Sequence, residues 1–236
     1  MNMEKKFELT DNFIINAFGV KLFQIKCTKS FKYAKEGDLG GYVEKDENLD
    51  QESDAWVSGD ARVYGDARVS GDAWVSGDAR VYGDAWVSGD AWVYGNARVY
   101  GDARVYGDAR VSGDAWVSGD AWVYGNARVY GDARVSGNAW VSGDARVYGD
   151  ARVYGDAEID NNNKHCGFDC FGSANRHTHA YLTKENKVEI TCGFFRGSIE
   201  EFEKRVEETH SGTIYEKQYK AIIDVIKIKF GLTDLI

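Results

Sequence analysis

Five side chains able to bind a metal or move a proton gather in one short stretch: His165, Cys166, Cys170, His177 and His179. Thiolates and imidazoles are the ligands that zinc prefers, and a structural zinc site usually presents two closely spaced pairs of them. Here the spacings are Cys-x3-Cys and His-x-His, which match that signature weakly. We keep Cys166, Cys170, His177 and His179 as weak zinc candidates. The alternative is a buried cysteine with surface histidines in a connecting segment, and we expect no cofactor.

A second pair could serve nucleophilic chemistry, because a thiol and an imidazole can act as nucleophile and base. Cys192 and His210 are the residues concerned, but no oxyanion motif and no third group accompany them in the sequence. We therefore expect Cys192 to be a core residue before a turn. The sequence predicts no catalytic residue and a protein that is not an enzyme.

Tryptophan, tyrosine and arginine, the types enriched at binding hot spots, are concentrated in the middle of the chain. All 7 tryptophans fall between Trp56 and Trp140. They occupy a hexapeptide, [D/N]-A-[R/W]-V-[Y/S]-G, which runs without insertion from Asp54 to Gly155 and ends in a degenerate copy at 156–161. Alternating Ala and Val indicate a strand with one apolar face. Gly followed by Asp or Asn is typical of a turn, so each hexapeptide predicts one short strand and one corner.

Strands this short bury their apolar faces only when successive coils stack in parallel. Three hexapeptides make one triangular coil of 18 residues, and residues 54–161 make six coils. At about 4.8 Å per coil the stack is roughly 29 Å tall. The chain has 0 prolines, as expected where every interior amide is needed for a ladder hydrogen bond. The predicted fold is an all-β solenoid, a parallel β-helix, with a small α+β module at its C-terminal end.

This coil length stacks the outward side chains in three columns. The first column is Trp56, Trp74, Trp92, Arg110, Arg128 and Arg146; the second is Arg62, Arg80, Arg98, Trp116, Arg134 and Arg152; the third is Arg68, Trp86, Arg104, Trp122, Trp140 and Glu158. Rows of exposed tryptophans mark interaction surfaces. The first column, led by Trp56, Trp74 and Trp92, is the best candidate. Trp86, Trp122 and Trp140 of the third column are further candidates for a binding surface. Two alternatives stay open: arginine–tryptophan stacking that stabilises the solenoid itself, and drift during copying of the repeat.

The two ends of the chain lack the repeat and are expected to cap the open ladders of the solenoid. Residues 1–53 predict a cap in which 7–15 pairs with 19–27 and 37–53 forms an irregular first coil. Residues 162–236 predict the α+β module: a linker or turn at 161–166, a hairpin around 184–187, and two helices that begin after Ser198 and Thr213.

The repeat resembles that of the hexapeptide-repeat, left-handed parallel β-helix family, in which a small residue precedes an inward aliphatic by two positions, as Ala61 precedes Val63. The resemblance implies the left hand of the coil. Acyltransferases and carbonic anhydrases of that family use histidines on or between coils; this solenoid has none, so neither activity is expected. The whole layout also resembles uncharacterised phage and prophage proteins labelled polymer-forming. That second resemblance rests on 37–49, the hexapeptide array, 171–176 and 191–210.

Charge limits the choice of partner. The formal net charge is -9, and the solenoid carries most of it, with 10 Arg against 16 Asp and one Glu in residues 54–160. Nucleic-acid binding through phosphate neutralisation is therefore disfavoured. No run approaches the roughly 20 apolar residues of a membrane span, and the start does not read as a secretory signal, so a cytoplasmic protein is expected.

Three functions remain as hypotheses. The first is a phage-encoded, non-enzymatic protein that binds a protein partner and inhibits a host defence system such as a CRISPR effector. The second is a scaffold that self-associates into a trimer or filament. The third and weakest is an enzyme with its site in residues 162–236.

Overall fold

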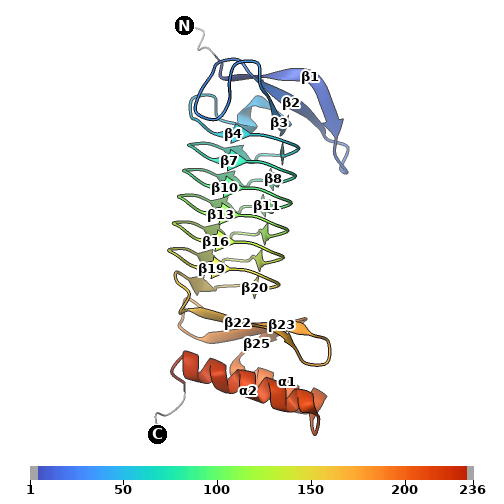
Figure 1. Cartoon of the computed structure of the whole chain (residues 1–236), viewed down its shortest axis with the longest axis vertical. Coiled ribbons are helices and arrows are strands. Elements are labelled where there is room, and N and C mark those ends of the chain that lie inside the picture. Colours follow the sequence, from blue (N-terminus) through green and yellow to red (C-terminus); the bar gives the residue numbers. More distant parts are fainter. Residues whose placement is uncertain (1–4, 233–236) are drawn as a thin grey trace.

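Stacked coils form three β-sheets of parallel strands that run along the molecule and enclose a core of alanine and valine (Figure 1). The computed structural model describes residues 5–232. Each side of the coil is named here by its first and last strands within the repeat. The β4–β19 sheet contains β4 (Trp56–Val57), β7 (Trp74–Val75), β10 (Trp92–Val93), β13 (Arg110–Val111), β16 (Arg128–Val129) and β19 (Arg146–Val147). The β5–β20 sheet contains β5 (Arg62–Val63), β8 (Arg80–Gly83), β11 (Arg98–Gly101), β14 (Trp116–Val117), β17 (Arg134–Val135) and β20 (Arg152–Val153). The β6–β21 sheet contains β6 (Arg68–Val69), β9 (Trp86–Val87), β12 (Arg104–Val105), β15 (Trp122–Val123), β18 (Trp140–Val141) and β21 (Glu158–Ile159).

The register confirms the predicted 18-residue coil. Val93 pairs with Val75 on one side and with Val111 on the other, a step of 18 positions each way. The ladder uses backbone amides such as that of Trp92, which donates to the carbonyl of Ala109 at 2.9 Å. Proline lacks this donor, which accounts for its absence from the repeat. The inward Ala and Val side chains from Ala55 to Val147 are 0% exposed.

Glycine is required at the corners for two reasons. Gly101 has φ +71°, a left-handed conformation that side-chain-bearing residues adopt at a cost. A Cβ on it would lie 3.1 Å from the amide nitrogen of Gly119 in the next coil. Close stacking of one corner on the next therefore depends on the missing side chain as well as on the backbone conformation.

The N-terminal cap continues one sheet of the solenoid. Strands β1 (Phe7–Ile15) and β2 (Lys21–Cys27) form the expected antiparallel hairpin. Strand β2 pairs with β3 (Leu39–Val43), which then pairs in parallel with β5, so β3 belongs to the first coil. The short helix η1 (Asp46–Asn48) follows, and buried Asn48 donates from Nδ2 to the carbonyls of Gly65 and Ala67 at 3.0 and 2.9 Å. These bonds give a partner to two backbone carbonyls at the open end of the ladder, at the top of the stack.

The C-terminal module closes the opposite end with a sheet and two helices. Strands β22 (His165–Phe171), β23 (Arg176–Leu182), β24 (Val188–Cys192) and β25 (Phe195–Gly197) form one antiparallel sheet. Helices α1 (Ile199–His210) and α2 (Ile214–Lys229) lie below it in Figure 1. The predicted capping residues are in place, since Ser198 and Thr213 accept from the amides of Glu201 and Glu216. Neither α1 nor α2 has the length and apolar character of a membrane span, nor has any other helix within residues 5–232.

The two faces of this sheet have different tasks. Ala180, Ile190 and Cys192 pack against the helices in a second apolar cluster, whereas Tyr181 belongs to the core of the solenoid. On the solenoid side, the Thr191 hydroxyl donates to the carbonyl of Arg152 at 3.0 Å. The module therefore covers the last coil directly. One prediction was wrong here: His165–Phe171, taken as part of a linker and connecting segment, is a strand.

Candidate binding face and histidine cavity

The columns of outward side chains stack as predicted, but the cap covers the upper end of the first one. Trp56 is 2% exposed, and its ring lies 5.4 Å from that of Phe31. Trp74 is half-buried; its Nε1 donates to Ser58 Oγ at 2.9 Å, and the Tyr33 ring lies 4.8 Å away. The predicted surface of three tryptophans is therefore not open, because Trp56 lies in the core and the loop between β2 and β3 covers Trp74.

On the two remaining sides, the tryptophans stack on cations or on each other. Trp116 lies between the guanidinium groups of Arg98 and Arg134, at 4.8 and 4.6 Å from its ring centroid. The same contacts extend along the β6–β21 sheet through Arg68, Trp86, Arg104, Trp122, Trp140 and Lys184, with centroid distances between 4.0 and 5.9 Å. Such contacts stabilise neighbouring coils against each other. On these two sides, the tryptophan and arginine pattern serves the solenoid.

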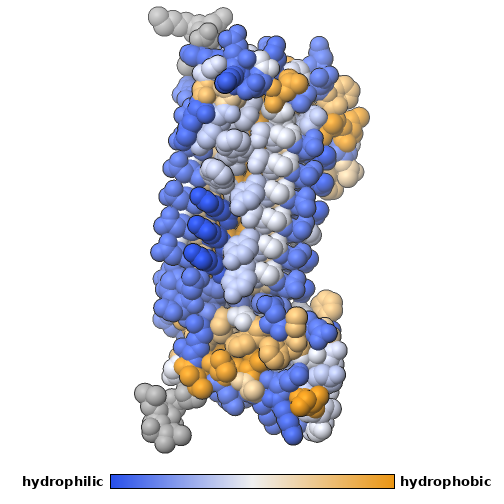
Figure 2. Space-filling view, viewed as in Figure 1, coloured by the Kyte–Doolittle hydropathy of each residue, from blue (hydrophilic) through white to orange (hydrophobic). Residues whose placement is uncertain are grey.

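The lower part of the β4–β19 sheet differs, because its aromatic and arginine side chains stay exposed. We call this surface the aromatic–arginine face; it consists of Trp92, Tyr94, Arg110, Arg128, Tyr130, Arg146 and Tyr148, all of them exposed. Arg110 lies 5.3 Å from the Trp92 ring, and Tyr130 stacks on Tyr148 at 5.5 Å. Within the described chain, the guanidinium groups of Arg128 and Arg146 have no hydrogen-bond or ion-pair partner. Figure 2 shows a column of strongly hydrophilic side chains beside a paler column, both running down to the C-terminal module.

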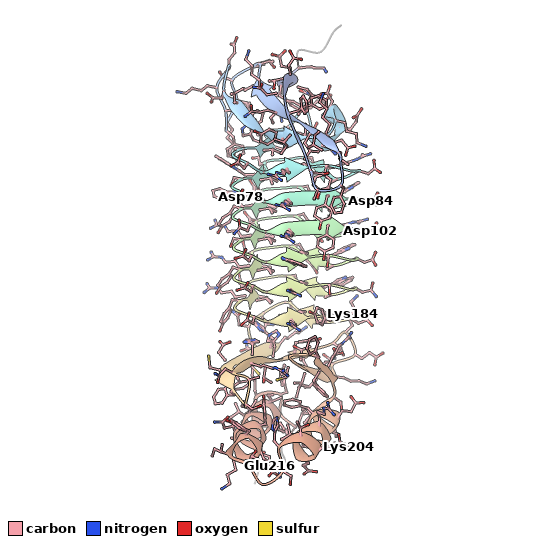
Figure 3. All side chains as sticks on the ribbon, turned by 90° about the vertical axis from the view of Figure 1, so that its right-hand side faces the viewer. Asp78, Asp84, Asp102, Lys184, Lys204 and Glu216 are labelled. Atoms are coloured by element: carbon pink, nitrogen blue, oxygen red, sulfur yellow. The ribbon has the colours of Figure 1, made fainter. Side chains whose placement is uncertain are left out.

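Aspartates line the corners between the three sides. Figure 3 shows Asp84 above Asp102 at one edge, with Asp78 at the opposite edge. Three asparagines interrupt these columns, and two of them donate to the aspartate of the next coil, as Asn96 does to Asp114 at 3.1 Å. Among the coils the structure describes, no corner aspartate lies within ion-pair distance of a solenoid arginine. The arginines of the aromatic–arginine face are thus bordered by carboxylates without being neutralised by them.

A cavity of about 470 Å³ opens at the foot of this face, between the last coils and the C-terminal sheet. It is lined by Tyr130, Arg146, Tyr148, Ala151, Asn162, His165, Cys166, Gly167, His177 and His179. Strands β22 and β23 place the three histidines on the sheet face that meets the solenoid. His165 Nδ1 and His179 Nε2 share a hydrogen bond at 3.0 Å, and Nδ1 of His177 bonds to the carboxylate of Asp169.

Burial controls the charge of these side chains. It lowers the pKa of His165 to about 4, with a smaller contribution from the positive charge of Lys229. Burial also holds the pKa of His179 well below its usual range, and both neighbouring histidines act in the same direction. The Cys166 thiol has its pKa raised to about 11 by burial. At neutral pH, His165 and His179 are therefore uncharged and Cys166 is a thiol. His177 Nε2 and His179 Nδ1 are buried and have no hydrogen-bond partner.

The weak zinc candidates do not come together as a set. Cys166, His177 and His179 line the cavity, but exposed Cys170 lies outside it, with φ 62°. No group of three metal-ligating side chains is found among residues 5–232. The alternative of surface histidines was also wrong: His165 is 7% and His179 1% exposed, because their strands pack on the last coil. The alternation of His177, His179 and Tyr181 is a strand signal that could have placed them on one face.

Comparison with known proteins supports the repeat architecture. A family model described as YdcK Beta solenoid repeat matches nine segments: 55–71, 61–77, 73–89, 79–95, 91–107, 103–119, 121–133, 127–143 and 145–157. All of them lie within the coils of the solenoid. No curated protein matches the chain. The protein is thus a repeat β-solenoid protein with a cap at each end.

Proposed function

We propose that the protein is a non-enzymatic binding protein that docks a protein partner on its aromatic–arginine face. The observation that carries this proposal is the contrast between the three sides. Four arginines of the other two sides stack on tryptophans. By contrast, Arg128 and Arg146 are exposed and unpaired beside the exposed, stacked rings of Tyr130 and Tyr148. Tyrosine and arginine on a rigid frame bind with little loss of conformational freedom, which favours their use as anchors.

A protein suits this face better than a nucleic acid does. The arginine column is one residue wide, and aspartate columns border it on both sides, so a continuous phosphate backbone would meet carboxylates. The net charge of -9 also repels a nucleic acid, over longer distances. An acidic or hydrogen-bonding protein surface with local negative charge complements a narrow column of arginines.

The identity of the partner and its compartment belong to the same proposal. The segments 37–49, 171–176 and 191–210 resemble those of phage and prophage proteins. On that resemblance we place the protein in the cytoplasm of a bacterial host. There its partner would be a component of a defence system, such as a CRISPR effector, which the rigid solenoid blocks by occupying a surface.

The test compares two equal changes of charge on different sides of the solenoid. Arg128→Asp alters the aromatic–arginine face, and Arg134→Asp makes the same change on the β5–β20 sheet. Immobilised wild-type protein and both variants, each checked for intact secondary structure, are exposed to host lysate and the retained proteins are quantified. We expect a retained protein that Arg128→Asp loses and Arg134→Asp keeps. Equal retention by both variants, or no retained protein at all, contradicts the proposal.

A self-associating scaffold is the second candidate, favoured by an observation on α2. Its outer surface exposes Ile214, Val225 and Ile228, at 60, 48 and 66%. Exposed apolar side chains along one helix suit contact with another copy. Light scattering across a range of concentrations separates the two functions. A trimer or filament supports the scaffold, and a monomer at every concentration removes it.

A further inference from the structure

Helix α2 carries an apolar stripe on the side that it turns away from the rest of the protein. We call this surface the α2 stripe; it consists of Ile214, Ala221, Val225 and Ile228, all of them exposed. Ile214 and Ile228 are 60 and 66% exposed. Spacings of seven, four and three residues place these side chains on one side of a helix. The opposite side of α2 packs in the second apolar cluster, so the fold accounts for one apolar side and leaves the other uncovered.

Two charged side chains lie beside the α2 stripe without a partner. Lys217 and Asp224 are exposed and, being seven positions apart, lie along the same edge of the stripe. Neither side chain has an ion pair or a hydrogen bond among residues 5–232. The other charged side chains of α2 are paired within the chain: Lys220 with Glu216 at 2.7 Å, Lys227 with Glu203 at 2.6 Å, and Lys229 with the backbone oxygen of Asn162 at 3.4 Å. One lysine and one aspartate are therefore free to pair outside the chain, at the edge of the apolar surface.

The α2 stripe is complementary to itself about a two-fold axis at Ala221. When a second α2 lies antiparallel across the first, residues at equal distances before and after Ala221 face each other. Ile214 lies seven positions before Ala221 and Ile228 seven positions after it, so each packs on the other. Lys217 lies four positions before Ala221 and Asp224 three positions after it. That mismatch is about 1.5 Å along the helix, which a lysine side chain spans easily.

These features favour a second copy of the chain as the occupant, in the antiparallel orientation. A parallel arrangement would place Lys217 beside Lys217 and Asp224 beside Asp224, and like charges at neighbouring positions repel each other. The small side chain of Ala221 at the axis lets the two helices approach closely. One helix face is smaller than the roughly 800 Å² per partner of a standard interface, so we expect a weak and reversible dimer.

We propose that two copies of the protein associate through α2 in an antiparallel, two-fold symmetric dimer. Ile214 of each copy packs on Ile228 of the other, and Lys217 of each copy pairs with Asp224 of the other. A contact that uses the same surface on both copies closes after two, so it produces neither a trimer nor a filament. Figure 1 places α2 at the end of the molecule opposite the N-terminal cap. The inference goes beyond the proposed function, because the dimer leaves the aromatic–arginine face of each copy free.

Sedimentation velocity of the full-length protein, recorded from micromolar to millimolar concentration, measures this association. We expect the wild type to pass from monomer to dimer as the concentration rises, and to form nothing larger. Ile228→Glu should weaken the dimer about a hundred-fold or more, because it removes two apolar contacts and places two charges against Ile214. Lys35→Glu, which changes an exposed lysine of the N-terminal cap, is the control and should associate as the wild type does.

Exchange of the two charges tests the antiparallel pairing itself. Lys217→Glu and Asp224→Lys should each weaken the dimer about ten-fold, because two ion pairs become two like-charge contacts. An equimolar mixture of these two variants should dimerise as the wild type does. In the mixed dimer the introduced glutamate faces the introduced lysine, and the native Lys217 faces the native Asp224.

Circular dichroism spectra of all variants confirm that α2 is intact before association is compared. A wild type that stays monomeric at every concentration overturns the proposal. So does a dimer that Ile228→Glu leaves unchanged, or a mixture of the two charge variants that dimerises no better than either variant alone.

Discussion

Acid should release the C-terminal module from the solenoid, because the interface between them buries two neutral histidines. His165 and His179 share a hydrogen bond there and face the last coil. The pKa of His165 is lowered to about 4 in the folded protein, against 6.5 for the unperturbed group. The unfolded state therefore takes up a proton first as the pH falls. Stability is constant above about pH 6.5 and declines between about pH 6.5 and pH 4.

The size of the effect follows from that pKa difference. A shift of 6.5 to about 4 spans about 2.5 pH units, and each unit corresponds to about 1.4 kcal/mol. His165 alone should therefore cost about 3 kcal/mol of stability by pH 4. His179 adds to this loss, because its pKa is lowered as well. A loss of this size is large beside the roughly 5–15 kcal/mol of a typical domain.

The assay is urea unfolding from pH 7.5 to pH 4.5, monitored by the circular dichroism signal of α-helix. Helices α1 and α2 supply most of the helical residues within 5–232, so this signal reports on the C-terminal module. Carboxylates also titrate toward the lower end of this range, so the wild type is compared with His165→Gln and with a His210→Gln control. We expect the stability of the wild type and the control to fall as the pH decreases, and that of His165→Gln to fall less. The reasoning is refuted if wild type and His165→Gln lose stability equally over this range.

Two further predictions concern the solenoid. Arg134→Ala, which removes one of the two cations on Trp116, should cost about 0.5–1 kcal/mol in thermal or urea unfolding. Arg128→Ala, whose guanidinium has no partner, should cost close to nothing, and equal costs would contradict the stabilising role of the stacks. Gly212→Ala, at φ +74° with nothing within 4 Å, should cost about 1–2 kcal/mol through the backbone alone. Gly101→Ala, at φ +71°, should cost clearly more because its Cβ meets the next coil; a smaller cost than at Gly212 would refute the corner argument.

The repeat made the solenoid predictable from sequence because local signals agreed at every position. Alternating Ala and Val require one buried face, the Gly–Asp pairs require corners, and a slip of one residue would expose every valine. The strict spacing then predicts which outward residues stack, as in the column from Trp92 to Arg146. A left-handed coil was predicted only from the resemblance, since the spacing alone does not determine the hand, and it stays a prediction.

The parts that sequence missed depend on packing between distant segments. Phe31 and Tyr33 lie in a loop without periodicity, so nothing in the sequence indicated that they would cover Trp56 and Trp74. Strand β22 was not predicted because Gly167 and Cys170, which has a left-handed backbone conformation, interrupt the alternation of polar and apolar residues in it. Without β22, the histidines looked like surface residues of a linker. Their burial follows from the docking of a whole sheet on the last coil, and tertiary contact of this kind leaves no local signal.

The central claim is that the aromatic–arginine face carries a protein partner, and site-specific photocrosslinking in the producing cells tests it most directly. A photoreactive phenylalanine analogue replaces Tyr130 on this face. In a separate variant it replaces Tyr106, at the same position of its hexapeptide but on the β6–β21 sheet, where it stacks on Tyr124 at 5.0 Å. We predict one dominant covalent adduct with another protein from position 130 and none from position 106. No adduct from position 130, or the same adducts from both positions, would contradict the account.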